Sequence, residues 1–108
     1  MPPLDIECER VEVSYDDDRP PKRDIPAIVS GCFLLDGQLC IVLVNHTDRP
    51  QTGRSSVSFA DYGFNADQVK IAKIYPEEGT TKSVSARRAH QSELQLEPAS
   101  AQVWIVSA

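Results

Sequence analysis

Apolar residues alternate with polar ones, or form short continuous runs, along most of the chain. The clearest pair of runs covers residues 27–35 and 38–45, on either side of Asp36-Gly37. Two apolar runs joined by Asp-Gly are typical of a β-hairpin with a two-residue turn. The sequence therefore predicts a hairpin over this stretch.

The rest of the chain predicts further short strands separated by turns. Residues 4–13 alternate with a change of phase near Glu9-Arg10, which suggests a bulge, and residues 14–23 and 45–53 are expected to be loops. The remaining strands are expected at residues 55–59, 69–75, 80–86, 93–97 and 101–106, with a helical turn at most within residues 59–67. Residues 80–86 hold Val84 as their single large apolar side chain, which suits a sheet edge. About eight short strands at this spacing predict an all-β fold, an antiparallel β-sandwich.

A two-residue turn at Asp36-Gly37 also fixes which hairpin residues face each other. Leu35 then pairs with Gln38, Phe33 with Cys40, and Cys32 with Ile41. Residues opposite each other share a face of the sheet, whereas neighbours along a strand do not. One face therefore carries Cys32, Leu34, Leu39, Ile41 and Leu43, and the other carries Phe33, Leu35, Cys40, Val42 and Val44.

Both predicted faces are apolar, although a sheet with one face in water should carry polar residues at every second position. One face must line the core, and the other needs a cover. The cover could be internal, from Tyr15, Ile25 and Ile28 of this chain. It could equally be a second protein surface, which would make the face with Phe33 and Leu35 a docking surface.

Composition and charge narrow the class of protein. The chain has 108 residues, 41% hydrophobic and 25% charged, which corresponds to one globular domain over residues 1–108. A net charge of -5 repels phosphate backbones and anionic lipids, so we expect neither nucleic acid nor membrane as a partner. The first residues lack the basic and apolar regions of a signal peptide. The compartment stays open, because a domain cut from a longer protein would look the same.

The three cysteines, Cys8, Cys32 and Cys40, are expected to be free thiols. Their number is odd, no two form a C-x-x-C pair, and His46 and His90 lie far apart in the sequence, so nothing resembles a zinc site. In the predicted register Cys32 and Cys40 point to opposite faces and cannot form a disulfide. We expect no metal and no other cofactor.

Two short motifs have a functional and a structural interpretation. The run Asp16-Asp17-Asp18 lacks the spacing of a calcium-binding loop and is expected to be solvated. The triplet Asn45-His46-Thr47 is an N-glycosylation sequon. Its structural alternative is a turn in which Asn45, Thr47 and Asp48 satisfy backbone groups.

The remaining chemical candidates do not form a catalytic pattern. His46 lies near Asp48, but catalysis also needs a nucleophile beside the base, and the serines at 55–56 and 83–85 fall inside predicted strands. Trp104 alternates with Val103 and Ile105, so we expect it in the core or a seam and not in a sugar-stacking platform. The sequence predicts no catalytic residue.

The order of segments from Ala27 onward carries a resemblance to a known family. An apolar hairpin with Asp36-Gly37 leads to the run 41–45 and the polar Thr47-Asp48. Residues 57–59 and 61–64 follow, and residues 94–103 end in a Pro-x-Ser turn that feeds the last strand. This order resembles the C-terminal β-sandwich domain that follows the catalytic barrel in glycoside hydrolases of the α-amylase and α-galactosidase kind. The resemblance covers residues 27–107, and residues 1–26, an N-terminal strand and loop, have no counterpart in it.

The resemblance implies a non-catalytic accessory domain of a carbohydrate-active enzyme that packs against a catalytic barrel or a partner chain. In that family the catalytic acids lie in the barrel, so no catalytic residue is carried over to this chain. Two alternatives stay open. One is a stand-alone carbohydrate-binding module, and the other is a β-sandwich adaptor that binds protein, including a second copy of itself.

Overall fold

The computed structural model describes residues 4–13, 23–79 and 81–108. Within these residues the chain forms ten β-strands and one short 3₁₀ turn. The elements are β1 (Asp5–Cys8), β2 (Arg10–Val13), β3 (Arg23–Pro26), β4 (Ile28–Leu35), β5 (Gln38–Asn45), β6 (Gln51–Val57), η1 (Phe59–Tyr62), β7 (Gln68–Tyr75), β8 (Lys82–Ser85), β9 (His90–Leu96) and β10 (Ser100–Ser107). All strand pairings are antiparallel. The prediction of an all-β, antiparallel, sandwich-like fold is confirmed. No helix in the described ranges has the length and apolar character needed to cross a membrane.

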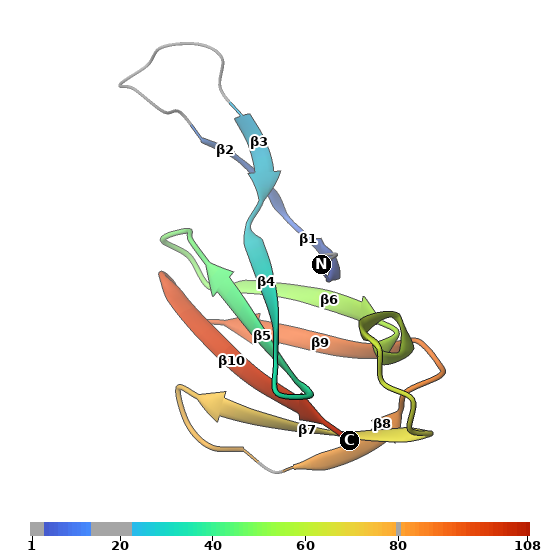
Figure 1. Ribbon diagram of the computed structural model, residues 1–108. Helices are drawn as coiled ribbons and strands as arrows, with labels where there is room; N and C mark the ends of the chain where they lie inside the picture. The colour runs from blue at the N-terminus through green and yellow to red at the C-terminus, as the bar shows by residue number, and fades with distance from the viewer. Residues whose placement is uncertain (1–3, 14–22, 80) are drawn as a thin grey trace.

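Two sheets enclose the core (Figure 1). The larger has the strand order β4-β5-β10-β7-β8, and the smaller has the order β1-β6-β9. Between them lie the buried side chains Leu4, Ile28, Leu39, Ile41, Leu43, Val57, Phe59, Leu94, Leu96, Trp104 and Val106. Because one sheet has five strands and the other three, the larger sheet presents more inner surface than the smaller can cover.

The β4–β5 hairpin has the register that its turn predicts. Leu35 pairs with Gln38, Phe33 with Cys40, and Cys32 with Ile41. Asp36 and Gly37 both have positive φ, 51° and 77°, as a type I′ turn requires. The face with Leu39, Ile41 and Leu43 lines the core, and these three side chains are fully buried.

The N-terminal segment differs from its prediction. The change of phase near Glu9 is not a bulge, because the chain leaves the smaller sheet there: β1 pairs with β6, whereas β2 pairs with β3. The carbonyl of Glu9 accepts a hydrogen bond from the Ala27 N–H at 2.8 Å where the chain returns. The β2–β3 ribbon projects away from both sheets (Figure 1). The run Asp16-Asp17-Asp18 and Tyr15 lie outside the described residues.

Other boundaries agree with the pattern or shift by a few residues. The strand β8 lies at the edge of the larger sheet, as the apolar-poor segment around Val84 predicts. The helical turn is the 3₁₀ turn η1, which ends at Gly63 with φ 89°. The strand β6 begins at Gln51, inside the predicted 45–53 loop. The polar Gln51 can be buried there because its amide donates hydrogen bonds to Glu9 Oε2 at 3.0 Å and to Thr47 Oγ1 at 3.2 Å.

Candidate functional site

The side of the larger sheet that faces away from the core is apolar across four strands. The pairings place Val42 of β5 opposite Gly31 of β4 and Val103 of β10, and Val103 in turn opposite Tyr75 of β7. Because paired residues share a face, the predicted hairpin face continues across the sheet. We define the outer face by Val29, Phe33, Leu35, Cys40, Val42, Val44, Ala72, Tyr75, Ala101, Val103 and Ile105.

The outer face is exposed at its edges and half-buried at its centre. The exposed fraction is 60% for Phe33, 72% for Leu35 and 54% for Tyr75. The central side chains, among them Cys40 and Val42, are half-buried by their neighbours on the same face. Phe33 lies back over Gly31, since a Cβ at Gly31 would meet the Phe33 ring at 3.4 Å. The five residues that sequence reasoning assigned to the possible docking face therefore do share one surface.

The described part of the N-terminal segment does not supply the internal cover considered above. Ile28 points into the core and is 1% exposed. Ile25 pairs with Val11 in the β2–β3 ribbon. Two of the three proposed cover residues are thus placed elsewhere, because β3 pairs with β2 and the inward positions of β4 begin at Ile28. Tyr15, the third, lies outside the described residues.

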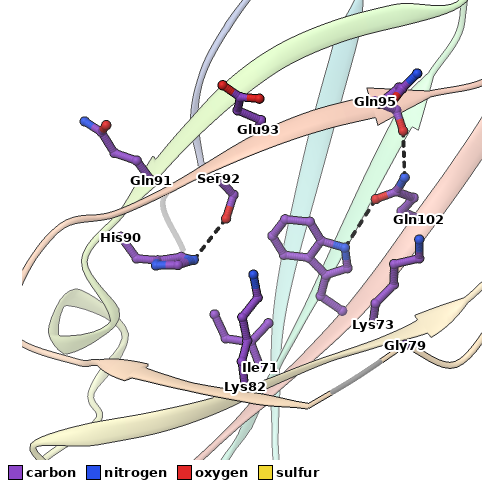
Figure 2. A pocket seen from close by; sticks show the side chains of 11 residues that line it. Ile71, Lys73, Gly79, Lys82, His90, Gln91, Ser92, Glu93, Gln95 and Gln102 are labelled. Atoms are coloured by element: carbon purple, nitrogen blue, oxygen red, sulfur yellow. Dashed lines mark hydrogen bonds between the residues drawn. The ribbon is translucent and has the colours of Figure 1, made fainter.

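A second feature is a cleft of about 640 Å³ on the opposite side of the same sheet, where β7, β8 and β10 extend beyond β9 (Figure 2). Strand alternation directs Ile71 and Lys73 of β7, Lys82 of β8, and Trp104 of β10 toward this inner side. The strand β9 contributes His90 and Ser92. A volume in the range of about 300–1,000 Å³ is typical of small-molecule sites.

His90 and Ser92 form a hydrogen-bonded pair in the cleft, with 2.9 Å between His90 Nε2 and Ser92 Oγ. The imidazole also lies near the Phe59 ring, with 6.2 Å between the ring centroids. Burial, and to a smaller extent the Lys82 ammonium, lowers the pKa of His90, so the imidazole is neutral at pH 7. A serine beside a neutral histidine resembles a nucleophile and its base. In the described ranges, however, no carboxylate bonds to the other imidazole nitrogen to orient it.

Two cationic side chains enter the same cleft. Lys73 comes from β7 and Lys82 from the edge strand β8, and Figure 2 shows the Lys82 ammonium near Ser92 and the Lys73 ammonium near Gln102, in different parts of the cleft. No ion pair joins either lysine to a carboxylate in the part of the chain that the structure describes. Glu93 lines the rim, but it is exposed and its carboxylate points away from the lysines in Figure 2.

The sequon at Asn45 has a structural role. Asn45 is fully buried. Its Nδ2 donates to the carbonyls of Arg49 at 2.8 Å, Leu96 at 3.3 Å and Glu97 at 3.0 Å. Its Oδ1 accepts the Thr47 N–H at 2.9 Å and the Thr47 Oγ1–H at 2.7 Å. This amide holds two loops together, which confirms the turn interpretation for Asn45 and Thr47. Because it is buried, the amide is inaccessible to a glycosyltransferase in the folded chain.

The other sequence candidates do not come together. His46 Nε2 lies 2.8 Å from the Pro26 carbonyl, and no hydrogen bond joins His46 to Asp48 among the described residues. Trp104 is 9% exposed, as expected for a core or seam residue, although it also lines the cleft.

All three cysteines are free thiols. Cys8 and Cys32 pack against the core, whereas Cys40 lies on the outer face. Burial raises the pKa of the Cys32 thiol, which makes it a poor nucleophile at pH 7. The described residues contain no cluster of three or more His, Cys, Asp or Glu side chains that could hold a metal ion.

Sequence reasoning missed the His90–Ser92 pair and the two cleft lysines. Alternation of the 93–97 strand, continued backward from Leu94, places Ser92 and His90 on the same inward face. That signal was present in the sequence. The lysines carried no such signal, because the position of Lys82 on the inner side of the sheet depends on its pairing with Ile71. A scan against protein-family models finds no match to this chain, and a search of curated proteins returns no relative.

Proposed function

We propose that this chain is a non-catalytic accessory β-sandwich domain of a carbohydrate-active enzyme, and that its outer face docks on the catalytic domain of that enzyme. One observation carries the proposal: the outer face is apolar across four strands, and no described segment of the chain covers it. The order of segments in residues 27–107, which resembles glycosidase C-terminal domains, supports this choice of partner.

The size of the outer face suits an interface between domains. Its four strands have eight residues each. At about 3.3 Å per residue and about 4.8 Å between strands, they cover roughly 500 Å² in plan. The largest apolar patch on a typical monomer is about 300–600 Å², and interfaces between domains of one chain bury about 600–1,500 Å² in total over both sides. The outer face and an equal partner surface fall within the second range.

The charge of the chain favours a different protein over a second copy as the occupant. The outer face as defined contains no charged side chain. Lys70 lies at its margin, opposite Ser107. Two copies would bring two net charges of -5 together around a flat contact, which costs self-repulsion. A catalytic domain need not carry that charge.

Site-specific photocrosslinking in the organism that encodes the chain tests the proposal. In one variant the photoreactive residue benzoylphenylalanine would replace Phe33 on the outer face. In the control variant it would replace Thr52, an exposed residue on the outward side of the smaller sheet. We expect irradiation to join position 33, and not position 52, to a protein whose peptides identify a glycoside hydrolase catalytic domain. A chain-to-chain adduct at position 33, equal adducts at both positions, or no adduct would contradict the proposal.

A further inference from the structure

We propose that the cleft between β7, β8, β9 and β10 binds a sugar that carries an anionic group, with the positive charge of Lys73 and Lys82 attracting the anion and Trp104, which lines the cleft, contacting the ring. The proposal goes beyond docking, because the cleft lies on the inner side of the larger sheet, opposite the outer face. Its failure would leave the docking proposal intact.

The first argument is the placement of charge. The chain has a net charge of -5, yet the two ammonium groups that enter the cleft have no carboxylate partner in the described ranges. Lys82 is exposed, whereas Lys73 is half-buried, which makes an unpaired ammonium at Lys73 less well solvated than one at the open surface. An anionic ligand would neutralise the positive charge of these ammonium groups. A carboxylate or phosphate accepts several charge-assisted hydrogen bonds, which are stronger than neutral ones.

The second argument is the mixture of aromatic and neutral polar groups beside the lysines. Trp104 and Ile71 supply apolar surface within the cleft. Around them stand Ser92, the neutral His90 and Gln102, whose amide donates to the Gln95 carbonyl at 2.9 Å and accepts the Trp104 Nε1–H at 3.4 Å (Figure 2). A sugar ring presents an apolar face for the indole and hydroxyl groups for these side chains. A bare inorganic anion would leave the indole and the amides unused.

The third argument is the position of the lysines on the sheet. In an antiparallel sheet, inward positions that the core fills carry apolar side chains, as Val69 and Ile71 do farther along β7. Lys73 continues the same inward alternation, and Lys82 pairs directly with Ile71. The sheet therefore places cations on its inner side only where the smaller sheet no longer covers it.

The single tryptophan gives the experiment a built-in reporter, because the chain has one indole N–H. The full chain would be titrated with D-glucuronate, glucose 6-phosphate, neutral glucose and inorganic phosphate while the indole N–H resonance and the backbone amides of β7–β10 are followed by NMR. We expect saturable shifts with at least one anionic sugar, weaker binding of glucose and of inorganic phosphate, and loss of affinity with added salt.

Variants test whether the two cleft lysines contribute to binding. The double variant Lys73→Gln/Lys82→Gln should weaken binding of the anionic sugar by about tenfold or more, because it removes the two cationic side chains that attract the anion. The matched control is Lys70→Gln, which removes a lysine from the opposite face of the same strand and should leave affinity unchanged. Urea unfolding verifies that each variant is folded, and the salt dependence of the wild-type chain tests the charge assignment without any variant.

Each outcome decides the proposal. Binding of glucuronate alone, or of glucose 6-phosphate alone, supports it and identifies the anion as a carboxylate or a phosphate. Equal binding of glucose, equal binding of inorganic phosphate, unchanged affinity in the double variant, or no binding of either anionic sugar would overturn it.

Discussion

Replacing Asn45 with alanine removes a buried side chain that takes part in five hydrogen bonds. The amide joins the end of β5 to the carbonyls of Arg49, Leu96 and Glu97, and it also accepts two hydrogen bonds from Thr47. Its two N–H groups are shared among three acceptors, so about four effective hydrogen bonds are lost. Alanine can form none of them.

The magnitude follows from burial. A hydrogen bond contributes about 1 kcal/mol net, and a buried group left without a partner costs about 1–3 kcal/mol. The Leu96 carbonyl is the acceptor whose bond to Asn45 is fully buried, whereas the Arg49 and Glu97 contacts are partly buried and can be hydrated in the variant. Asn45→Ala should therefore lower the free energy of unfolding by about 3 kcal/mol.

Urea unfolding monitored by tryptophan fluorescence measures this loss. With a slope of about 1–3 kcal/mol/M, the midpoint should fall by about 1–3 M. The control is Asn65→Ala, which truncates an exposed asparagine and should change stability by less than about 0.5 kcal/mol. A loss below about 1 kcal/mol in Asn45→Ala would show that these contacts do not hold the loops as described.

Three further predictions concern other parts of the chain. A methyl group at Gly53 would meet the Glu7 carbonyl oxygen at 2.8 Å, so Gly53→Ala should destabilise the chain by about 1–3 kcal/mol in urea unfolding; Gly79→Ala, where the nearest side-chain atom would be 3.5 Å away, is the control. The chain should not hydrolyse nitrophenyl esters or glycosides, because no carboxylate among the described residues orients His90; a turnover that Ser92→Ala abolishes would refute this. Burial, followed by the Lys82 ammonium, lowers the pKa of His90 from its ordinary 6.5, so the unfolded chain binds this proton more readily and stability should fall as pH drops below about 6.5. The His90→Gln variant should lose part of that dependence, and an unchanged slope of stability against pH would contradict the assignment.

Local signals in the sequence were sufficient to predict the β4–β5 hairpin but not the β2–β3 ribbon. The register of β4 with β5 follows from Asp36-Gly37 and from alternation over residues that are close in the chain. The strand β3 gave no such signal, because Ile25 stands alone between charged residues and proline. Its pairing with β2 spans residues 14–22, so neither turn chemistry nor alternation could reveal it.

The candidate sites required strand order, which the sequence does not display. The hairpin half of the outer face was visible from alternation, but its continuation to Val103 and Tyr75 depends on β10 lying between β5 and β7. The cleft depends on the same order and on the smaller sheet ending at β9. These are contacts between residues far apart in the chain, and several orders of the strands would satisfy the same apolar pattern.

The most direct test of the central claim is the accessibility of Cys40 in the full chain. Cys40 lies on the outer face, whereas Cys8 and Cys32 pack against the core. The chain would be treated with iodoacetamide under native conditions, the labelled residue identified by peptide mass spectrometry, and the mass in solution measured by sedimentation equilibrium. The account predicts a monomer in which Cys40 is labelled under native conditions, as expected for a half-buried thiol on an uncovered face. A monomer whose Cys40 resists labelling would mean that the chain covers its own outer face, and a dimer with Cys40 protected would mean that a second copy does; either result would contradict an outer face kept open for another protein.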